Sequence, residues 1–144
     1  MKKYEFTGEV KVKFGVTLKR IRALIDFGNV KKGELGGFIE KEENLSYAGD
    51  AWVSGDAEVS GNARVSGDAD YMVIGPIGSR FGFTTFFKNK NNKISVSCGC
   101  FLGTLAEFRA AVREKHGTDT KFAKVYQVAA DLAELQIEHI EKAD

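Results

Sequence analysis

The chain has 144 residues, of which 43% are hydrophobic and 28% charged, so it can form one domain or two small ones around a real core. Its formal net charge of +1 argues against binding a nucleic acid polymer by bulk electrostatics, and no apolar run reaches the length of a membrane span. The basic N-terminus is not followed by the apolar segment of a signal peptide, and the only cysteines, Cys98 and Cys100, do not fit a disulfide framework. These features predict a cytoplasmic protein.

The charge is sorted by segment. Residues 1–33 carry a net charge of +6, residues 34–70 carry −7, residues 71–103 carry +4 and residues 104–144 carry −2. The third segment stands out because it contains four basic residues and no acidic residue. An anionic partner is therefore expected there.

Residues 1–44 are predicted to form an N-terminal β cap, with strands near Glu9–Phe14 and Leu18–Phe27. Residues 45–72 then repeat with a period of six, as GDAWVS, GDAEVS, GNARVS and GDADYM. In each repeat an Ala and, two residues later, a Val or Tyr share one face of a short strand, and Ser-Gly-Asp or Ser-Gly-Asn turns the chain. Repeats of this length stack as a parallel β-helix.

These hexapeptides resemble those of small phage and prophage proteins with a left-handed β-helix of hexapeptide repeats. The upstream runs LKRIRALIDFGNVKKGELGGFIE and GGFIEKEENLSYAGDAWV and the tail DYMVIGPIGSRFGFTTFFKNKNNKISVSCGCFLGTLAEF are similar to the same proteins. The resemblance covers roughly residues 17–140 and lends no site residues. It implies a homo-oligomer, with a trimer as the first expectation, in the cytoplasm of a bacterial host. A solenoid of little more than one turn cannot bury its interior alone, which also predicts self-association.

Residues 73–144 predict an α+β C-terminal domain, so the whole chain is expected to be α+β and rich in β-structure. Strands are expected at 70–77, 84–88 and 93–101, with KNKNN as a hairpin turn between the last two. A helix follows from Thr104, which forms a capping box with Glu107, and it ends at Gly117. A second helix is expected from about 120 to 141, with an apolar arc wide enough to make contact on two sides.

The loop GPIGSR, residues 75–80, is the most suggestive candidate site. Its glycines allow backbone N–H groups to converge on an anion, and its arginine can bind a phosphate or carboxylate with two hydrogen bonds. A tight turn without a ligand is the alternative. The predicted ligand-binding residues are Gly75, Gly78, Ser79, Arg80, Thr84, Thr85, Lys88 and Ser97.

Other chemistries are less favoured. Many hexapeptide β-helices are acyltransferases that use a His of the coils as general base, but this chain has only His116 and His139, both outside the repeats. Two thiols at Cys98 and Cys100 make half a zinc site at most. No catalytic residue, metal or cofactor is therefore predicted.

Three functions remain. The first is a non-catalytic oligomer that captures a small anionic ligand; the phage-type resemblance suggests a nucleotide immune signal, sequestered by a so-called anti-defence sponge. The second is a structural or host-protein-binding homo-oligomer without a small ligand. The third, an acyltransferase, is the least favoured.

Overall fold

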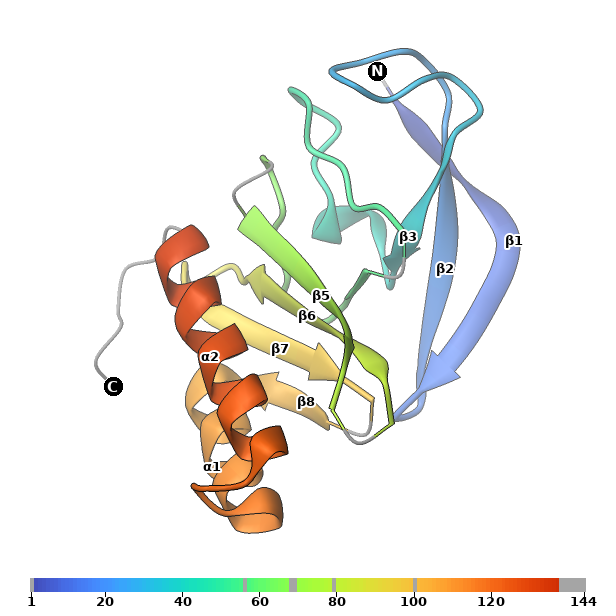
Figure 1. The fold of residues 1–144 in the computed structure, drawn as a ribbon. Helices are drawn as coiled ribbons and strands as arrows, with labels where there is room; N and C mark the ends of the chain where they lie inside the picture. Colours follow the sequence, from blue (N-terminus) through green and yellow to red (C-terminus); the bar gives the residue numbers. More distant parts are fainter. Residues whose placement is uncertain (1, 56, 68–69, 79, 100, 138–144) are drawn as a thin grey trace.

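The described chain folds as two four-stranded sheets and two helices (Figure 1). The computed structural model describes residues 2–55, 57–67, 70–78, 80–99 and 101–137. Its α+β, strand-rich architecture agrees with the predicted class. In Figure 1 the first sheet lies on the N-terminal side of the molecule, the second lies beside it, and the helices cover the far face of the second sheet.

The first sheet has the order β1-β2-β3-β4. Its strands are β1 (Tyr4–Lys13), β2 (Val16–Ala23), β3 (Leu35–Ile39) and β4 (Glu58–Val59). The first three pair antiparallel, whereas β3 and β4 pair parallel. The predicted strand near 18–27 is thus shorter than expected, and β3 was not predicted at all.

The repeated segment runs as a coil along this sheet. The Ala and Val positions of the repeat face inward, as predicted, because each is at most 1% exposed: Ala51, Val53, Ala57, Val59, Ala63 and Val65. Phe38 pairs with Glu58, Ile39 with Val59 and Leu45 with Val65, all in parallel. Residues 1–44 and 45–72 therefore share one hydrophobic core.

Trp52 departs from the pattern of the repeat. It occupies a position between Ala and Val, where the period places a side chain outside the coil. The structure covers it with Phe27, whose ring meets the indole edge-to-face at 5.4 Å, and leaves it 5% exposed. The N-terminal segment thus buries the outer side of this repeat as well.

The second sheet has the order β5-β6-β7-β8, and every neighbouring pair is antiparallel. Its strands are β5 (Tyr71–Ile77), β6 (Gly82–Lys88), β7 (Ile94–Cys98) and β8 (Phe101–Thr104). The prediction of a single strand over 93–101 is wrong, because the chain reverses at Gly99, where φ is +39°, and forms a hairpin. Cys100 and its relation to Cys98 lie outside the described residues.

The helices are α1 (Leu105–His116) and α2 (Lys121–Gln136). The predicted capping box of α1 is confirmed, since Glu107 N donates to Thr104 Oγ1 and Thr104 N to Glu107 Oε1. Gly117 ends α1 at φ +76°. The predicted second helix is confirmed from residue 121 to 136, but it ends there, because Ile137 is extended; residues 138–141 of the prediction lie outside the described residues. Neither helix, as far as it is described, is long and apolar enough to cross a membrane.

Strand β6 connects two hydrophobic cores. Phe87 is 1% exposed and belongs to the first core, with the coil and the first sheet. Phe86, 0% exposed, points to the other face and belongs to the second core, where it meets Phe108 of α1 edge-to-face. Because successive side chains of a strand alternate, one short strand fixes both layers to each other.

Exchanging Val59 for Asp should unfold the first core. The substitution places an unpaired carboxylate at a site that is 0% exposed, which costs several kcal/mol. Ser60→Ala, one position further on, should change the free energy of unfolding by less than about 0.5 kcal/mol, since the Ser60 hydroxyl makes no hydrogen bond to the described residues and the change adds no bulk. Urea denaturation of both variants measures the difference, and equal losses would contradict the inward phase of the repeat.

Candidate functional site

Most of the predicted ligand-binding side chains are engaged inside the protein. Thr84 donates to Cys98 Sγ at 3.1 Å on the helix-facing side of the second sheet. Thr85 lies on the opposite face, where its hydroxyl accepts from Glu58 N at 3.1 Å. Both threonines are buried, at 1% and 2% exposure. Adjacent in sequence, they therefore belong to different layers.

The other two predicted polar residues, Ser97 and Lys88, each contact a charged side chain. Ser97 Oγ accepts from Lys13 Nζ at 2.9 Å. Lys88 Nζ lies 3.0 Å from Asp70 Oδ1, and Asp70 also accepts from the backbone N–H and the hydroxyl of Ser66. Burial raises the pKa of Asp70, but the hydrogen bonds from Ser66 and the charge of Lys88 lower it by more than burial raises it. The pKa of Asp70 therefore lies below its usual range.

The glycines of GPIGSR are explained by packing. A Cβ on Gly78, where φ is +81°, would come within 1.8 Å of the Tyr126 hydroxyl of α2. A Cβ on Gly75 would come within 2.6 Å of the Gly82 carbonyl oxygen. Arg80 is exposed, and Ser79 lies outside the described residues. Of the seven predicted residues that the structure describes, Arg80 is thus the one exposed charge, and the set does not converge on one surface.

Glu58 of β4 ties the two outer strands of the first sheet together through its carboxylate, and it reaches the second sheet through its backbone N–H, which donates to Thr85 Oγ1. Its carboxylate accepts from Lys11 Nζ at 2.6 Å and from Lys13 Nζ at 2.9 Å, and its side chain is 16% exposed. Lys11 also lies over the Phe38 ring, 4.2 Å from its centroid. Burial raises the pKa of Glu58, but the hydrogen bonds and charges of the two lysines outweigh burial, so the pKa lies below its usual range.

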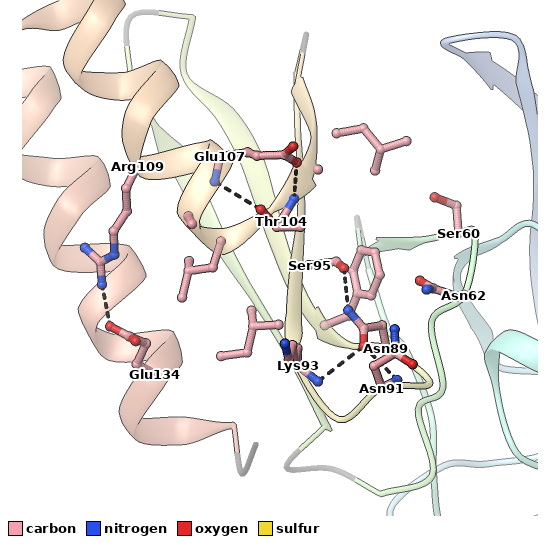
Figure 2. Close-up of a pocket in the computed structure, with 17 residues that line it drawn as sticks. Ser60, Asn62, Asn89, Asn91, Lys93, Ser95, Thr104, Glu107, Arg109 and Glu134 are labelled. Carbon is pink, nitrogen blue, oxygen red and sulfur yellow. Dashed lines mark hydrogen bonds and ion pairs between the residues drawn. The ribbon is translucent and has the colours of Figure 1, made fainter. Parts of the chain in front are cut away.

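A broad groove of about 910 Å³ lies where the coil leaves part of the second sheet uncovered (Figure 2). The coil contributes one wall, the turn between β6 and β7 lies at one end, and β8 with the start of α1 forms the other wall. None of the predicted ligand residues that the structure describes lines it. Its polar lining residues are Ser60, Asn62, Asn89, Asn91, Lys93, Ser95, Thr104, Glu107, Arg109 and Glu134.

Asn89 organises the turn at the end of the groove. Its Oδ1 accepts from the backbone N–H groups of Asn91 and Lys93 at 2.9 and 3.2 Å, and its Nδ2 donates to Ser95 Oγ at 3.0 Å. The coil is joined to the same turn by main-chain bonds, including Lys90 N to Asn62 O at 2.7 Å. The coil and the turn are therefore joined directly at this end of the groove.

The opposite wall is held by helix contacts. Thr104 and Glu107 satisfy each other in the capping box of α1. Arg109 donates to Gln127 Oε1 at 2.8 Å and pairs with Asp131 and Glu134 of α2, at 2.9 and 2.5 Å. The charge of Arg109 is therefore compensated by α2, and these contacts hold α1 and α2 together along this wall.

Four polar side chains of the groove make no hydrogen bond or ion pair within the described part of the chain: Ser60, Asn62, Asn91 and Lys93. Ser60 is 7% exposed, and Figure 2 shows its hydroxyl directed toward the groove. Hydroxyl and amide groups both donate and accept, and the Lys93 ammonium donates and carries a positive charge. The arrangement can bind a ligand rich in oxygen acceptors, with its negative charge near Lys93.

Sequence reasoning missed this groove because it joins the repeat to a distant hairpin. One usable signal was present: Lys93 is among the four bases of the acid-free segment 71–103. Ser60 and Asn62 occupy a turn of the repeat, where turn formation alone accounts for Gly, Ser and Asn.

The residues considered for catalysis or metal binding lie elsewhere or do not cluster within the described part of the chain. His116 lies at the end of α1, where its ring stacks on Tyr126 with centroids 5.8 Å apart, and it does not line the groove. Within the described ranges, no three His, Cys, Asp or Glu residues come together in a way that could hold a metal ion.

Comparisons with protein-family models, with curated proteins and with solved structures find no match to this chain.

Glu58→Gln should lower the free energy of unfolding near neutral pH and make that free energy depend less on pH in the acidic range. The pKa of Glu58 is depressed in the folded state, so its contribution is complete above the unfolded pKa of about 4.3 and disappears as the pH falls through the folded value. We expect a loss of about 1–3 kcal/mol at pH 7, the range for a hydrogen-bonded charge. Urea denaturation between pH 7 and pH 3 measures it, and parallel curves for the two proteins would contradict this role.

Gly78→Ala should be more destabilising than Gly33→Ala. Both glycines have positive φ, +81° and +88°, so a side chain strains both backbones to a similar extent. Only at Gly78 would the new Cβ also collide with Tyr126, since nothing lies within 4 Å of the corresponding position at Gly33. Overpacking costs about 1–3 kcal/mol, which is the expected difference in thermal or urea denaturation. Equal losses of stability in the two variants would show that the contact between Gly78 and Tyr126 of α2 does not require a glycine.

Proposed function

We propose that this protein is a non-catalytic, self-associating binding protein that captures a small anionic ligand of the nucleotide class in the groove between the coil, the second sheet and α1. The observation that carries the proposal is a group of four polar side chains on a groove of about 910 Å³ that make no side-chain hydrogen bond to any described residue: Ser60, Asn62, Asn91 and Lys93. Pockets for small ligands and cofactors have volumes of this order.

The lining matches a nucleotide-like ligand in two respects. Hydroxyl and amide side chains can bind sugar hydroxyls and base edges, and the ammonium of Lys93 can bind a phosphate. Leu102, which is 40% exposed, adds apolar surface for a flat ring. The charge of the second sheet supports an anion, because residues 71–103 contain four bases and no acid.

Capture without turnover is the mode of action that we propose. Of the two carboxylates that line the groove, Glu107 caps α1 and Glu134 pairs with Arg109, so neither is positioned as a free base. The phage-type resemblance of the repeats gives capture a purpose, the removal of a nucleotide immune signal inside a bacterial host. A homo-oligomer of such subunits would hold several ligands at once.

A host-protein-binding function is the second candidate. It is favoured by the exposed aromatic tip of the β5–β6 hairpin, where Phe81 is 74% and Phe83 42% exposed. Large exposed apolar side chains close together are typical of protein contacts. This function needs no ligand in the groove.

For the coil we propose the finer architecture of a single left-handed β-helix turn. Two observations support it: the inward Ala and Val positions, and the parallel pairing of Phe38 with Glu58 and of Leu45 with Val65, each 20 residues apart. A turn of three hexapeptides takes about eighteen residues. A crystal structure that traces a right-handed or flat path would exclude it.

A ligand screen separates these functions. The protein is mixed with cyclic mononucleotides, cyclic dinucleotides and ADP-ribose derivatives, binding is measured by calorimetry, and the ligand is recovered after heat denaturation. Binding with intact recovery supports capture, and a chemically altered ligand contradicts it in favour of an enzyme. If none of these ligands binds, the proposed ligand class is wrong and the host-protein function is favoured.

Lys93→Ala should weaken binding of the ligand found in this screen by about tenfold, because a hydrogen bond to a charged group is worth about 1.5 kcal/mol at the lower end of its range. Lys90→Ala is the matched control. Lys90 is an exposed lysine of the same turn that does not line the groove, so its loss changes net charge equally and should leave affinity nearly unchanged. If Arg80→Ala weakens binding and Lys93→Ala does not, the ligand binds at the β5–β6 hairpin instead.

A further inference from the structure

Helix α2 carries an exposed apolar stripe. Val128, Leu132 and Leu135 are 64%, 43% and 87% exposed, and Val125, one step before them, is half-buried. The four residues are separated by three, four and three positions, which is the spacing of the contact positions in a pair of coiled helices. Such spacing places all four on one line along the helix.

This stripe is a second face of the helix. The first face is already used, since Ala123, Ala130 and Ala133 are 0% exposed and pack in the second core. Small side chains there let α2 lie close to its own domain, while the larger Val and Leu side chains point away from it. The distribution is the opposite of that expected for a helix whose outer face only meets water.

The charges of α2 run against its own dipole. Lys121 and Lys124 lie in the first turn, which contains no acid, and the last turn contains no base. Asp131 lies in the C-terminal half, next to the stripe and ion-paired to Arg109. A helix N-terminus favours negative charge and a C-terminus positive charge, so an isolated α2 has this polarity reversed.

We infer that the stripe of α2 binds the same stripe of a second copy of this chain, with the two helices antiparallel. The inference rests on the proposed self-association and names the surface that produces it. In this arrangement the lysines at each N-terminal end approach the acidic half of the partner helix, where the Asp131 side chain pairs with Arg109 but is 65% exposed, so opposite charges face each other. A parallel arrangement would place like ends together.

The flanking positions also distinguish the two arrangements. Lys124 and Asp131 are seven residues apart and lie along the same edge of the stripe. Antiparallel pairing brings this edge of one copy against the same edge of the other, so that Lys124 of each copy faces Asp131 of its partner. The two-fold symmetry produces this contact twice. Parallel pairing would set the same edge against Ala129 and Gln136, which carry no charge. The occupant that this surface fits is therefore its own copy, related by a two-fold axis.

An antiparallel pair predicts a dimer of about 32 kDa, twice the 15.8 kDa of one chain, in place of the trimer that the hexapeptide resemblance implies. Light scattering on a dilution series of the full chain measures the mass and the dimer dissociation constant. Leu135→Glu should raise that constant by at least about tenfold, because it buries a carboxylate in the apolar contact at each end of the helix pair. Gln136→Glu adds the same charge one residue off the stripe and should leave the mass unchanged.

The fold of each variant is checked by circular dichroism, and Leu135, at 87% exposure, can be replaced without opening the core. Charge reversal then tests direction: Lys124→Glu should weaken the dimer, and adding Asp131→Lys should restore it. A dimer or trimer that Leu135→Glu leaves intact would overturn the α2 contact but not self-association. A monomer at every concentration would overturn both, while nucleotide capture would still stand or fall on the calorimetry.

Discussion

The structure depends on a single strand that must satisfy two hydrophobic cores. Strand β6 is seven residues long, and its adjacent phenylalanines, Phe86 and Phe87, are buried in opposite directions. Each of its neighbouring polar side chains follows the same division, with Thr84 turned to Cys98 and Thr85 to the backbone of Glu58. The strand leaves no freedom for the layers to slide, because a shift of one residue would exchange every buried side chain.

The groove follows from the same arrangement. The coil covers the β6 side of the second sheet through Phe87 and the main-chain bonds of residues 62–64 to the β6–β7 turn, but it does not reach across β7 and β8. A concave surface therefore remains at the far strands, bounded by rigid elements on both sides. Its polar side chains are supplied by turns, where they are not needed for packing, which is the usual origin of binding sites on a fixed scaffold.

Most local signals in the sequence were read correctly, apart from the turn at Gly99, whereas long-range ones were not. The capping box of Thr104 and Glu107, the Gly117 end of α1 and the inward Ala and Val positions depend only on neighbours within a few residues. Strand β3 was missed because Gly36 and Gly37 weaken a strand pattern. Both are required by contacts to Val53 and Ala57, whose carbonyl oxygens would lie 2.7 Å from an added Cβ. The candidate ligand residues failed to converge for a similar reason, since partners such as Glu58 lie far from them along the chain.

The contribution of Phe87 to the first core has a consequence for biosynthesis. Residues 4–65 form that core, yet one of its large buried side chains arrives from β6, more than twenty residues downstream. As the chain leaves the ribosome from its N-terminus, the coil cannot complete its packing until β6 has emerged. We therefore expect the N-terminal half to lack part of its core packing until β6 has been synthesised.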